Sequence, residues 1–176
     1  MTENLAYPIG HFNPPSRIDQ ALIDLWIQQI ASFPGKLTQE LHGLSPTDLL
    51  RKHRPGGWTI QQLVHHCADS HMNSFIRFKL ALTEENPIIK PYEEHLWAEL
   101  ADVTQIDIAS SLSILTGLHQ RWELLLRSLD TEELDRTFVH PATQKMISLK
   151  TNIGIYAWHA EHHLAHLKNA KLMEIY

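Results

Sequence analysis

Four long stretches of the sequence repeat apolar residues at the spacing of an α-helix, and no other feature restricts the possible folds as strongly. They begin near Ser16, Thr59, residue 107 and Ser148, with little β-prone sequence between them. A helix with one apolar stripe has to bury that stripe against neighbouring helices. The pattern therefore predicts an all-α protein, and the economical architecture is a four-helix bundle.

Local signals predict where these helices begin and end. Phe-Pro-Gly at 33–35 predicts the end of the first helix, because proline lacks a backbone N–H and glycine favours helix ends. Thr59 and Gln62 have the spacing of a capping box, which predicts the start of the second helix. The last two helices are predicted over 107–129 and 148–169.

The remaining segments are short and predict small elements. Residues 1–15 contain several prolines and a glycine, and we expect an extended N-terminal arm. Residues 92–101 are compatible with a short helix. Residues 136–150 hold two β-prone runs around a turn, which predicts a small β-hairpin before the last long helix. No linker or repeat divides the chain, so we expect one domain over residues 1–176.

Composition excludes several functional classes. The net charge of −5 is dispersed along the chain, which does not favour binding to nucleic acid or to an anionic membrane. No apolar run is long enough to span a bilayer, and the N-terminus does not resemble a signal peptide. Cys67 is the one cysteine, so no internal disulfide can form and a reducing cytoplasm is the expected location. Its place on an apolar stripe predicts a buried side chain rather than a nucleophile.

The 13 histidines are the unusual component, and four of them lie within eight residues of the last predicted helix, in YAWHAEHHLAHLKNA. A helix advances about 100° per residue, which places His163 about 80° and His159 about 120° from the centre of the apolar stripe, on one flank. Two histidines four residues apart can reach one metal ion. We therefore interpret His159 and His163 as candidate metal ligands, although a solvated polar face is the alternative.

A catalytic zinc site normally has three protein ligands and one open position, so a third ligand is expected from another helix. The segment VHHCADSH of the second helix offers candidates. His66 lies roughly 120° from the centre of its apolar stripe on one flank, and His65 lies roughly 140° from it on the other flank. These angles do not distinguish between the two.

Other histidines have simpler interpretations. His162 points away from the apolar stripe, and His166 lies between that direction and the flank of His159 and His163. We therefore expect both His162 and His166 to be exposed. His71 lies on a stripe, which favours a hydrogen-bonded core histidine, and His119 is either structural or solvated. A surface role is the default for the scattered histidines His11, His42, His53, His95 and His140.

Sequence signatures of some other metal and nucleotide sites are absent. The chain has no HExxH motif, no Glu-x-x-His motif, no P-loop and no GxGxxG motif. Glu161 lies between the candidate ligands in sequence, but helical geometry points it to another side. Zincin proteases, ferritin-like di-iron proteins and nucleotide-binding proteins of these types are therefore not indicated.

Several longer motifs, taken together, resemble the YfiT branch of the DinB/YfiT-like superfamily, in the same order over nearly the whole chain. They are YPIGHF, RPGGWTIQQLVHHCADSHMNSFIRFKLALTE, IIKPYEEHLWAEL, LHQRW, FVHP and YAWHAEHHLAHL. This resemblance implies a four-helix bundle, a homodimer and a metal-dependent hydrolase acting on a small molecule. It also implies a site of three histidines that binds Zn²⁺ or Ni²⁺.

Carried over by motif position, the resemblance implies three metal ligands. His66 is the second histidine of VHH, His159 follows Trp158, and His163 is the second histidine of the adjacent pair. The resemblance therefore favours His66 over His65. Other superfamily members use low-molecular-weight thiols, so a thiol cofactor is a second implied possibility.

Three neutral imidazoles and an open position allow more than one chemistry. The leading hypothesis is metal-assisted hydrolysis by an activated water molecule. The alternatives are thiol transfer, in which the metal activates a bacillithiol-type cofactor as thiolate, and a non-catalytic metal-dependent binding protein. Arg77 could bind a substrate carboxylate, and Asp69 or Asn73 could orient the second nitrogen of a ligand histidine.

Overall fold

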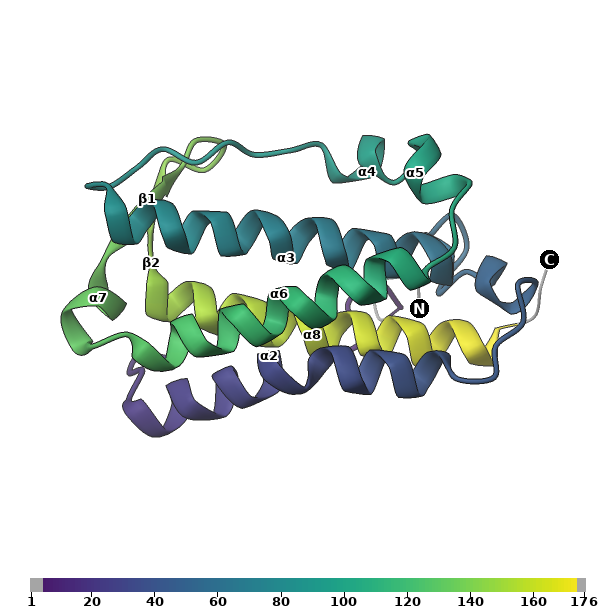
Figure 1. Ribbon diagram of the computed structural model, residues 1–176, viewed down its shortest axis with the longest axis horizontal. Coiled ribbons are helices and arrows are strands. Elements are labelled where there is room, and N and C mark those ends of the chain that lie inside the picture. Colours follow the sequence, from purple (N-terminus) through teal and green to yellow (C-terminus); the bar gives the residue numbers. More distant parts are fainter. Residues whose placement is uncertain (1–4, 174–176) are drawn as a thin grey trace.

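The computed structural model describes residues 5–173, and four long helices lie side by side in it (Figure 1). They are α2 (Gln20–Leu41), α3 (Ile60–Thr83), α6 (Ala109–Ser128) and α8 (Leu149–Leu172). α2 and α3 each pack against both α6 and α8, so that α2 and α3 lie diagonally across the bundle. The predicted all-α four-helix bundle is therefore confirmed. Within the described part of the chain, none of the helices combines the length and hydropathy needed to cross a membrane.

The long connection between α3 and α6 determines the direction of the helices. Residues 84–108 return along the bundle before α6 begins, so that α3 and α6 run in the same direction, as do α2 and α8 (Figure 1). The connection carries the short helices α4 (Glu94–Trp97) and α5 (Ala101–Thr104), and α4 lies inside the predicted segment 92–101. A single 3₁₀ turn, η1 (Asp48–Leu50), lies between α2 and α3.

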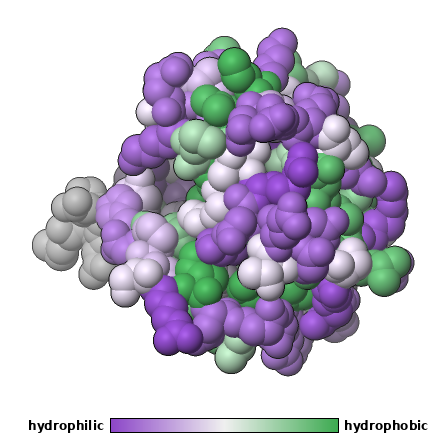
Figure 2. Space-filling model, turned by 90° about the vertical axis from the view of Figure 1, so that its left-hand side faces the viewer, coloured by the Kyte–Doolittle hydropathy of each residue, from purple (hydrophilic) through white to green (hydrophobic). Residues whose placement is uncertain are grey.

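One end of the bundle carries the short helix α7 (Thr131–Asp135) and the predicted hairpin. Its strands β1 (Thr137–His140) and β2 (Lys145–Ser148) pair antiparallel. The backbone of Val139 also exchanges hydrogen bonds with the α3–α6 connection, including a 2.9 Å bond to the Pro87 carbonyl. Figure 2 shows this end, where hydrophilic side chains predominate and hydrophobic ones lie between them. The hairpin thereby holds the long connection in place.

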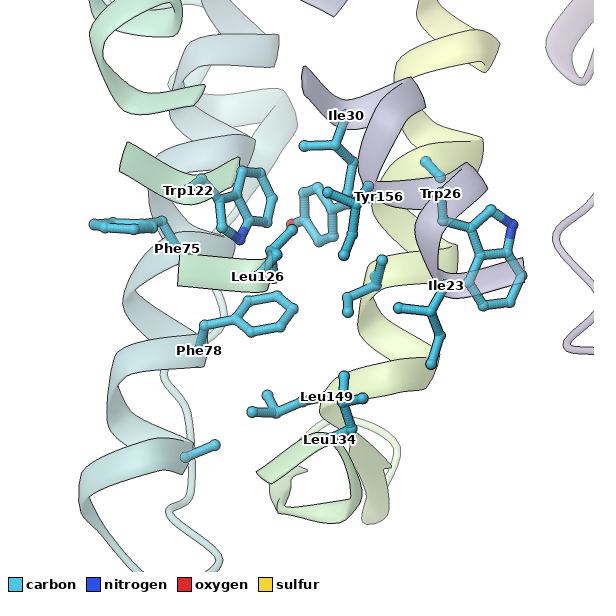
Figure 3. Packing of buried hydrophobic residues seen from close by; sticks show 14 of the residues in the cluster. Ile23, Trp26, Ile30, Phe75, Phe78, Trp122, Leu126, Leu134, Leu149 and Tyr156 are labelled. Carbon is cyan, nitrogen blue, oxygen red and sulfur yellow. The ribbon is translucent and has the colours of Figure 1, made fainter. Parts of the chain in front are cut away.

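The core towards this end of the bundle combines large side chains from all four long helices. Figure 3 shows Trp122 of α6 and Tyr156 of α8 directed toward each other, and their ring centroids are 5.5 Å apart. Phe78 of α3 packs edge-on against the same indole, and Ile30 of α2 is completely buried. Burying side chains of this size stabilises the fold by about 1.5–3 kcal/mol each. The stability of the bundle therefore depends on the apolar faces of all four long helices.

The predicted end of the first helix is wrong. α2 continues through Phe-Pro-Gly at 33–35 for a further turn and a half, and Pro34 is buried inside it. Because Pro34 has no N–H, the Ile30 carbonyl one turn earlier loses its helical partner. His119 of α6 donates its Nδ1–H to that carbonyl at 2.7 Å. This tertiary contact offsets part of the cost of an internal proline.

The helix starts agree with the sequence to different degrees. α2 begins at Gln20 rather than near Ser16, with the Asp19 side chain accepting the N–H of Leu22. The capping box of Thr59 and Gln62 is present as predicted, with both reciprocal hydrogen bonds formed. A capping box is a local interaction, which is why it can be recognised from sequence alone.

The N-terminal arm is less uniform than predicted, and it covers α8. Residues 1–4 lie outside the described part, residues 5 and 6 are helical, and a turn follows before the extended segment. The Gly10 carbonyl accepts a 3.1 Å hydrogen bond from the indole N–H of Trp158. The arm therefore lies against a face of α8 that would otherwise be exposed.

Gly154 provides a prediction about packing between α8, α2 and the arm. A Cβ atom at this position would lie 2.8 Å from the Trp26 ring and 2.9 Å from the Phe12 ring. We expect Gly154→Ala to lower the free energy of unfolding by about 1–3 kcal/mol, measured by urea denaturation, because the rings have to move. Gly117→Ala on α6 is the control: its Cβ would meet nothing within 4 Å, so a gain of up to about 1 kcal/mol is expected from helix propensity. Equal unfolding midpoints for wild type and Gly154→Ala would contradict this account.

Candidate metal centre

Three histidines predicted as metal ligands lie together between α3 and α8. His66 comes from α3, and His159 and His163 come from successive turns of α8. One nitrogen of each imidazole lies within 4.8 Å of the corresponding nitrogens of the other two. The Nε2 atoms of His159 and His163 are 3.2 Å apart. Two helices therefore bring three candidate nitrogen donors close together.

The spacing of the two α8 nitrogens fits a shared metal ion. Two nitrogens bound tetrahedrally to one Zn²⁺ at about 2.0–2.1 Å lie about 3.3–3.4 Å from each other. The observed Nε2–Nε2 distance of 3.2 Å differs from this by little. The i, i+4 spacing on α8 thus places the two nitrogens at a distance compatible with one tetrahedral ion.

Burial keeps the three imidazoles neutral. Desolvation, and then the charge that His166 would carry, lower the pKa of His66 to about 4. Desolvation and then neighbouring imidazoles lower the pKa of His159 and His163 well below the usual histidine value. Metal ions bind the neutral imidazole. At neutral pH the three donors are therefore in the form that a metal requires.

A cavity of about 360 Å³ borders the three histidines. The ring of Trp58 forms part of its wall and lies against His66, with ring centroids 4.6 Å apart. Among residues 5–173, no fourth histidine, cysteine or carboxylate joins these three donors within the same distance. One side of the centre is therefore available to water or a small molecule.

Two further histidines lie behind His159. The Nδ1 atom of His159 is 3.1 Å from Nε2 of His71, and Nδ1 of His71 is 2.7 Å from Nε2 of His119. Both are buried and hydrogen-bonded, which confirms the predicted core role of His71 and the structural alternative for His119. The Asn73 amide instead donates to the Asp69 backbone carbonyl at 2.9 Å. His71, and not Asp69 or Asn73, therefore contacts the second nitrogen of His159.

The predicted exposure of His162 and His166 is wrong. Their exposed fractions are only 6% and 5%. Trp158 stacks on His162 with ring centroids 4.5 Å apart, and the Ala6 carbonyl of the arm accepts the Nε2–H of His166 at 3.1 Å. His53, expected at the surface, is also buried and packs on His166. Angles on one helix cannot reveal such coverage, because it comes from segments distant in sequence.

Together with His163, His162 and His166 form a second histidine group, which the sequence pattern did not predict. His162, His163 and His166 also bring one nitrogen each within 4.8 Å of the others. The Nδ1 atom of each is buried and meets no hydrogen-bond partner among the described residues. Buried polar atoms of this kind normally bind water or a ligand. The dense histidine spacing of α8 was the available signal.

The neighbouring candidates face other directions. His65 points to α6, where its Nδ1 lies 2.8 Å from the Ser111 hydroxyl, so the structure brings His66 and not His65 to the other two donors. Glu161 pairs with Lys36 at 2.6 Å on the outside of the bundle. Cys67 is buried, as predicted, and burial raises the pKa of its thiol.

Arg77 lines a second cavity, of about 480 Å³, which also reaches His159. His140 lies in the same cavity, and burial and then the Arg77 charge lower its pKa. Ser70 lines it as well and is 3.4 Å from Nε2 of His159. The predicted anion-binding residue thus shares a cavity with a candidate metal ligand.

The sequence matches a known family over most of its length. The profile of the DinB superfamily matches residues 29–167. The chain belongs to this superfamily. YfiT from Bacillus subtilis is 48% identical over 164 residues, which are 93% of this chain and 92% of that protein. A Bacillus cereus relative is 49% identical over 168 residues, 96% of each chain, and both are named as candidate metal-dependent hydrolases.

The fold agrees with a solved structure of the same relative. The structure of YfiT from Bacillus subtilis superposes with a TM-score of 0.92 at 47% identity and covers 95% of both chains. It is described as a probable metal-dependent hydrolase with an unusual four-helix bundle topology. The bundle found here is therefore shared with a close relative.

Proposed function

We propose that this protein is a metal-dependent hydrolase of a small molecule and that His66, His159 and His163 hold its ion. The observation that carries the proposal is the convergence of three neutral imidazoles, two of them with nitrogens 3.2 Å apart, at a cavity. The names of the relatives support hydrolysis as the reaction class. An open side next to three nitrogen donors is typical of catalytic rather than structural zinc sites.

Zn²⁺ is the ion that we propose, with Ni²⁺ as the alternative, because imidazole donors suit both. Bound there, the ion would supply Lewis acidity that activates a water molecule and polarises a substrate carbonyl. The protein's own contribution is position: α3 and α8 hold the donors, and His71 supports His159 from behind. Trp58 gives the cavity an apolar wall beside His66.

The same proposal includes a homodimer in the cytoplasm. The resemblance to the YfiT branch suggests the dimer, and the single buried Cys67 is compatible with a reducing compartment. Sedimentation equilibrium of the purified protein tests the dimer directly.

The experiment compares zinc-loaded and chelator-treated protein on a panel of activated esters and amides. We expect hydrolysis by the zinc form, loss on chelation and recovery when zinc is restored. His66→Ala and free zinc at the same concentration are the controls, because dissolved zinc can itself catalyse ester hydrolysis. His65→Ala, which removes an imidazole that faces α6, should keep the wild-type rate.

A parallel assay uses monochlorobimane with and without a bacillithiol-type thiol. Conjugation that depends strictly on the thiol, with no zinc-dependent hydrolysis of the panel, would replace the hydrolase by a thiol transferase. Tight zinc binding without either reaction would favour a metal-dependent binding protein.

A further inference from the structure

A row of three histidines connects the internal proline of α2 to the candidate metal centre. The first link joins the Ile30 carbonyl to Nδ1 of His119 at 2.7 Å. The second joins Nε2 of His119 to Nδ1 of His71 at 2.7 Å, and the third joins Nε2 of His71 to Nδ1 of His159 at 3.1 Å. The row crosses the bundle through α6 and α3 and ends on a proposed ligand.

The Ile30 carbonyl determines where every proton in this row lies. A carbonyl only accepts, so His119 must carry its proton on Nδ1. A neutral imidazole has one N–H, so Nε2 of His119 accepts from His71. By the same rule, Nε2 of His71 accepts from Nδ1–H of His159. The Nε2 atom of His159 is then left with its lone pair, directed at the metal centre.

The reverse arrangement is unfavourable. It would place the lone pair of His119 Nδ1 against the oxygen of Ile30, inside the core, where an unmade hydrogen bond costs about 1–3 kcal/mol. Burial also keeps the two inner rings neutral: it lowers the pKa of His119 to about 4 and that of His71 well below the usual value. A single proton arrangement therefore satisfies all three links.

Pro34 explains why the terminal acceptor is available. In a regular helix the Ile30 carbonyl would accept the N–H of residue 34. Pro34 has no N–H and lies inside α2, so this oxygen has no partner within the helix. Pro34, which was wrongly predicted to end this helix, thus leaves free the carbonyl at which the hydrogen-bonded row begins.

We propose that His71 and His119 are positioning residues that hold His159 in the Nδ1–H tautomer and so present its Nε2 lone pair to the metal ion. The tautomer of a ligand histidine is generally determined by the hydrogen bond of its other nitrogen. His163 differs, since its Nδ1 meets no partner among the described residues. The proposal rests on the ligand set of the proposed function but not on the reaction catalysed.

Variants of His71 test the role of the row through zinc affinity. His71→Leu removes the acceptor of His159, and we expect zinc binding to weaken by roughly 10–100-fold, as is usual for groups that support a ligand histidine. His71→Gln should restore most of the affinity, because its amide can donate to His119 and its carbonyl can accept from His159. His65→Leu is the matched control, since it removes a buried histidine from the same helix whose partner, Ser111, is outside the row.

A direct reading of the tautomer uses ¹⁵N NMR of histidine-labelled, metal-free protein. We expect wild-type His159 to carry its proton on Nδ1 and His71→Leu to show a shift toward Nε2–H. The wild-type measurement alone tests the predicted tautomer, so the test does not depend on the folding of the variant. A wild-type His159 protonated on Nε2 would overturn the proposal.

The affinity data separate this proposal from the ligand assignment. Unchanged zinc affinity in His71→Leu, together with loss of zinc in His66→Ala, would overturn the role of the row alone. Retention of zinc by His66→Ala would instead overturn the ligand set. Hydrolysis is not measured in either comparison.

Discussion

Alanine in place of His66, His159 or His163 is expected to weaken zinc binding by roughly 10²–10³-fold in each case. The binding free energy of a four-ligand zinc site is about 10–16 kcal/mol, so that one ligand contributes about 2.5–4 kcal/mol, which corresponds to a factor of roughly 10²–10³ in affinity. Each alanine removes one of the three proposed protein donors. A competition titration against a chromophoric chelator measures the affinity, and elemental analysis measures the bound metal.

His162→Ala and His65→Ala are the matched controls for this prediction. His162 is adjacent to a proposed ligand and equally buried, but it belongs to the second histidine group. His65 is adjacent to His66 and faces α6. We expect both variants to retain zinc. Loss of zinc from these two, with retention in the three ligand variants, would show that the metal binds elsewhere.

The metal-free protein is expected to lose several kcal/mol of stability as the pH falls from 6.5 to 4. Burial, and then the charge of His166, lower the pKa of His53 to about 4 and that of His162 to about 3. Below pH 6.5 these histidines bind protons in the unfolded chain but stay neutral in the folded protein. Each pKa unit by which the folded and unfolded states differ corresponds to 1.36 kcal/mol of stability, so His53 alone accounts for about 3 kcal/mol.

The sign and the pH range follow from the direction of these shifts. The pKa values are lower in the folded state. The stability that these histidines contribute is therefore fully present above about pH 6.5 and declines as the pH falls toward the folded-state values near 4. Urea midpoints measured from pH 7 to pH 4 with a chelator present test this. His53→Gln should make the decline shallower, because unfolding then takes up one proton fewer. Glutamine can keep the hydrogen bond to the Trp58 carbonyl but does not titrate. A midpoint that stays constant over the range would contradict the prediction.

Added zinc should make this acid transition steeper. Protons and zinc compete for the same nitrogens, and zinc stabilises only the folded protein. The comparison of zinc-loaded and metal-free protein therefore separates the ligands from the other buried histidines.

Much of the scaffold of the candidate site could be predicted from the sequence because it depends on local geometry. The capping box of Thr59 and Gln62 and the hairpin at 136–150 involve residues close together in the chain. The same holds for His159 and His163, whose four-residue spacing places them on one side of any α-helix. Apolar periodicity was sufficient for the bundle.

The choice of the third donor needed more than local geometry. Angles on the second helix left His65 and His66 open, since either flank of an amphipathic helix can face a neighbour. The structure directs His65 to Ser111 of α6 and His66 to the histidines of α8. Which flank faces which helix depends on the order of helices in the bundle.

Taken alone, the sequence determined that there are four long helices, that they form a bundle and that two histidines share one side of α8, because each follows from periodicity within single segments. Tertiary structure alone decided that His162 and His166 are buried, that α2 continues through Pro34, and that His119 uses the carbonyl freed there. These features arise where segments distant in sequence meet. Burial and hydrogen bonding depend on the partner surface as much as on the residue itself, and a single helix does not specify its partner.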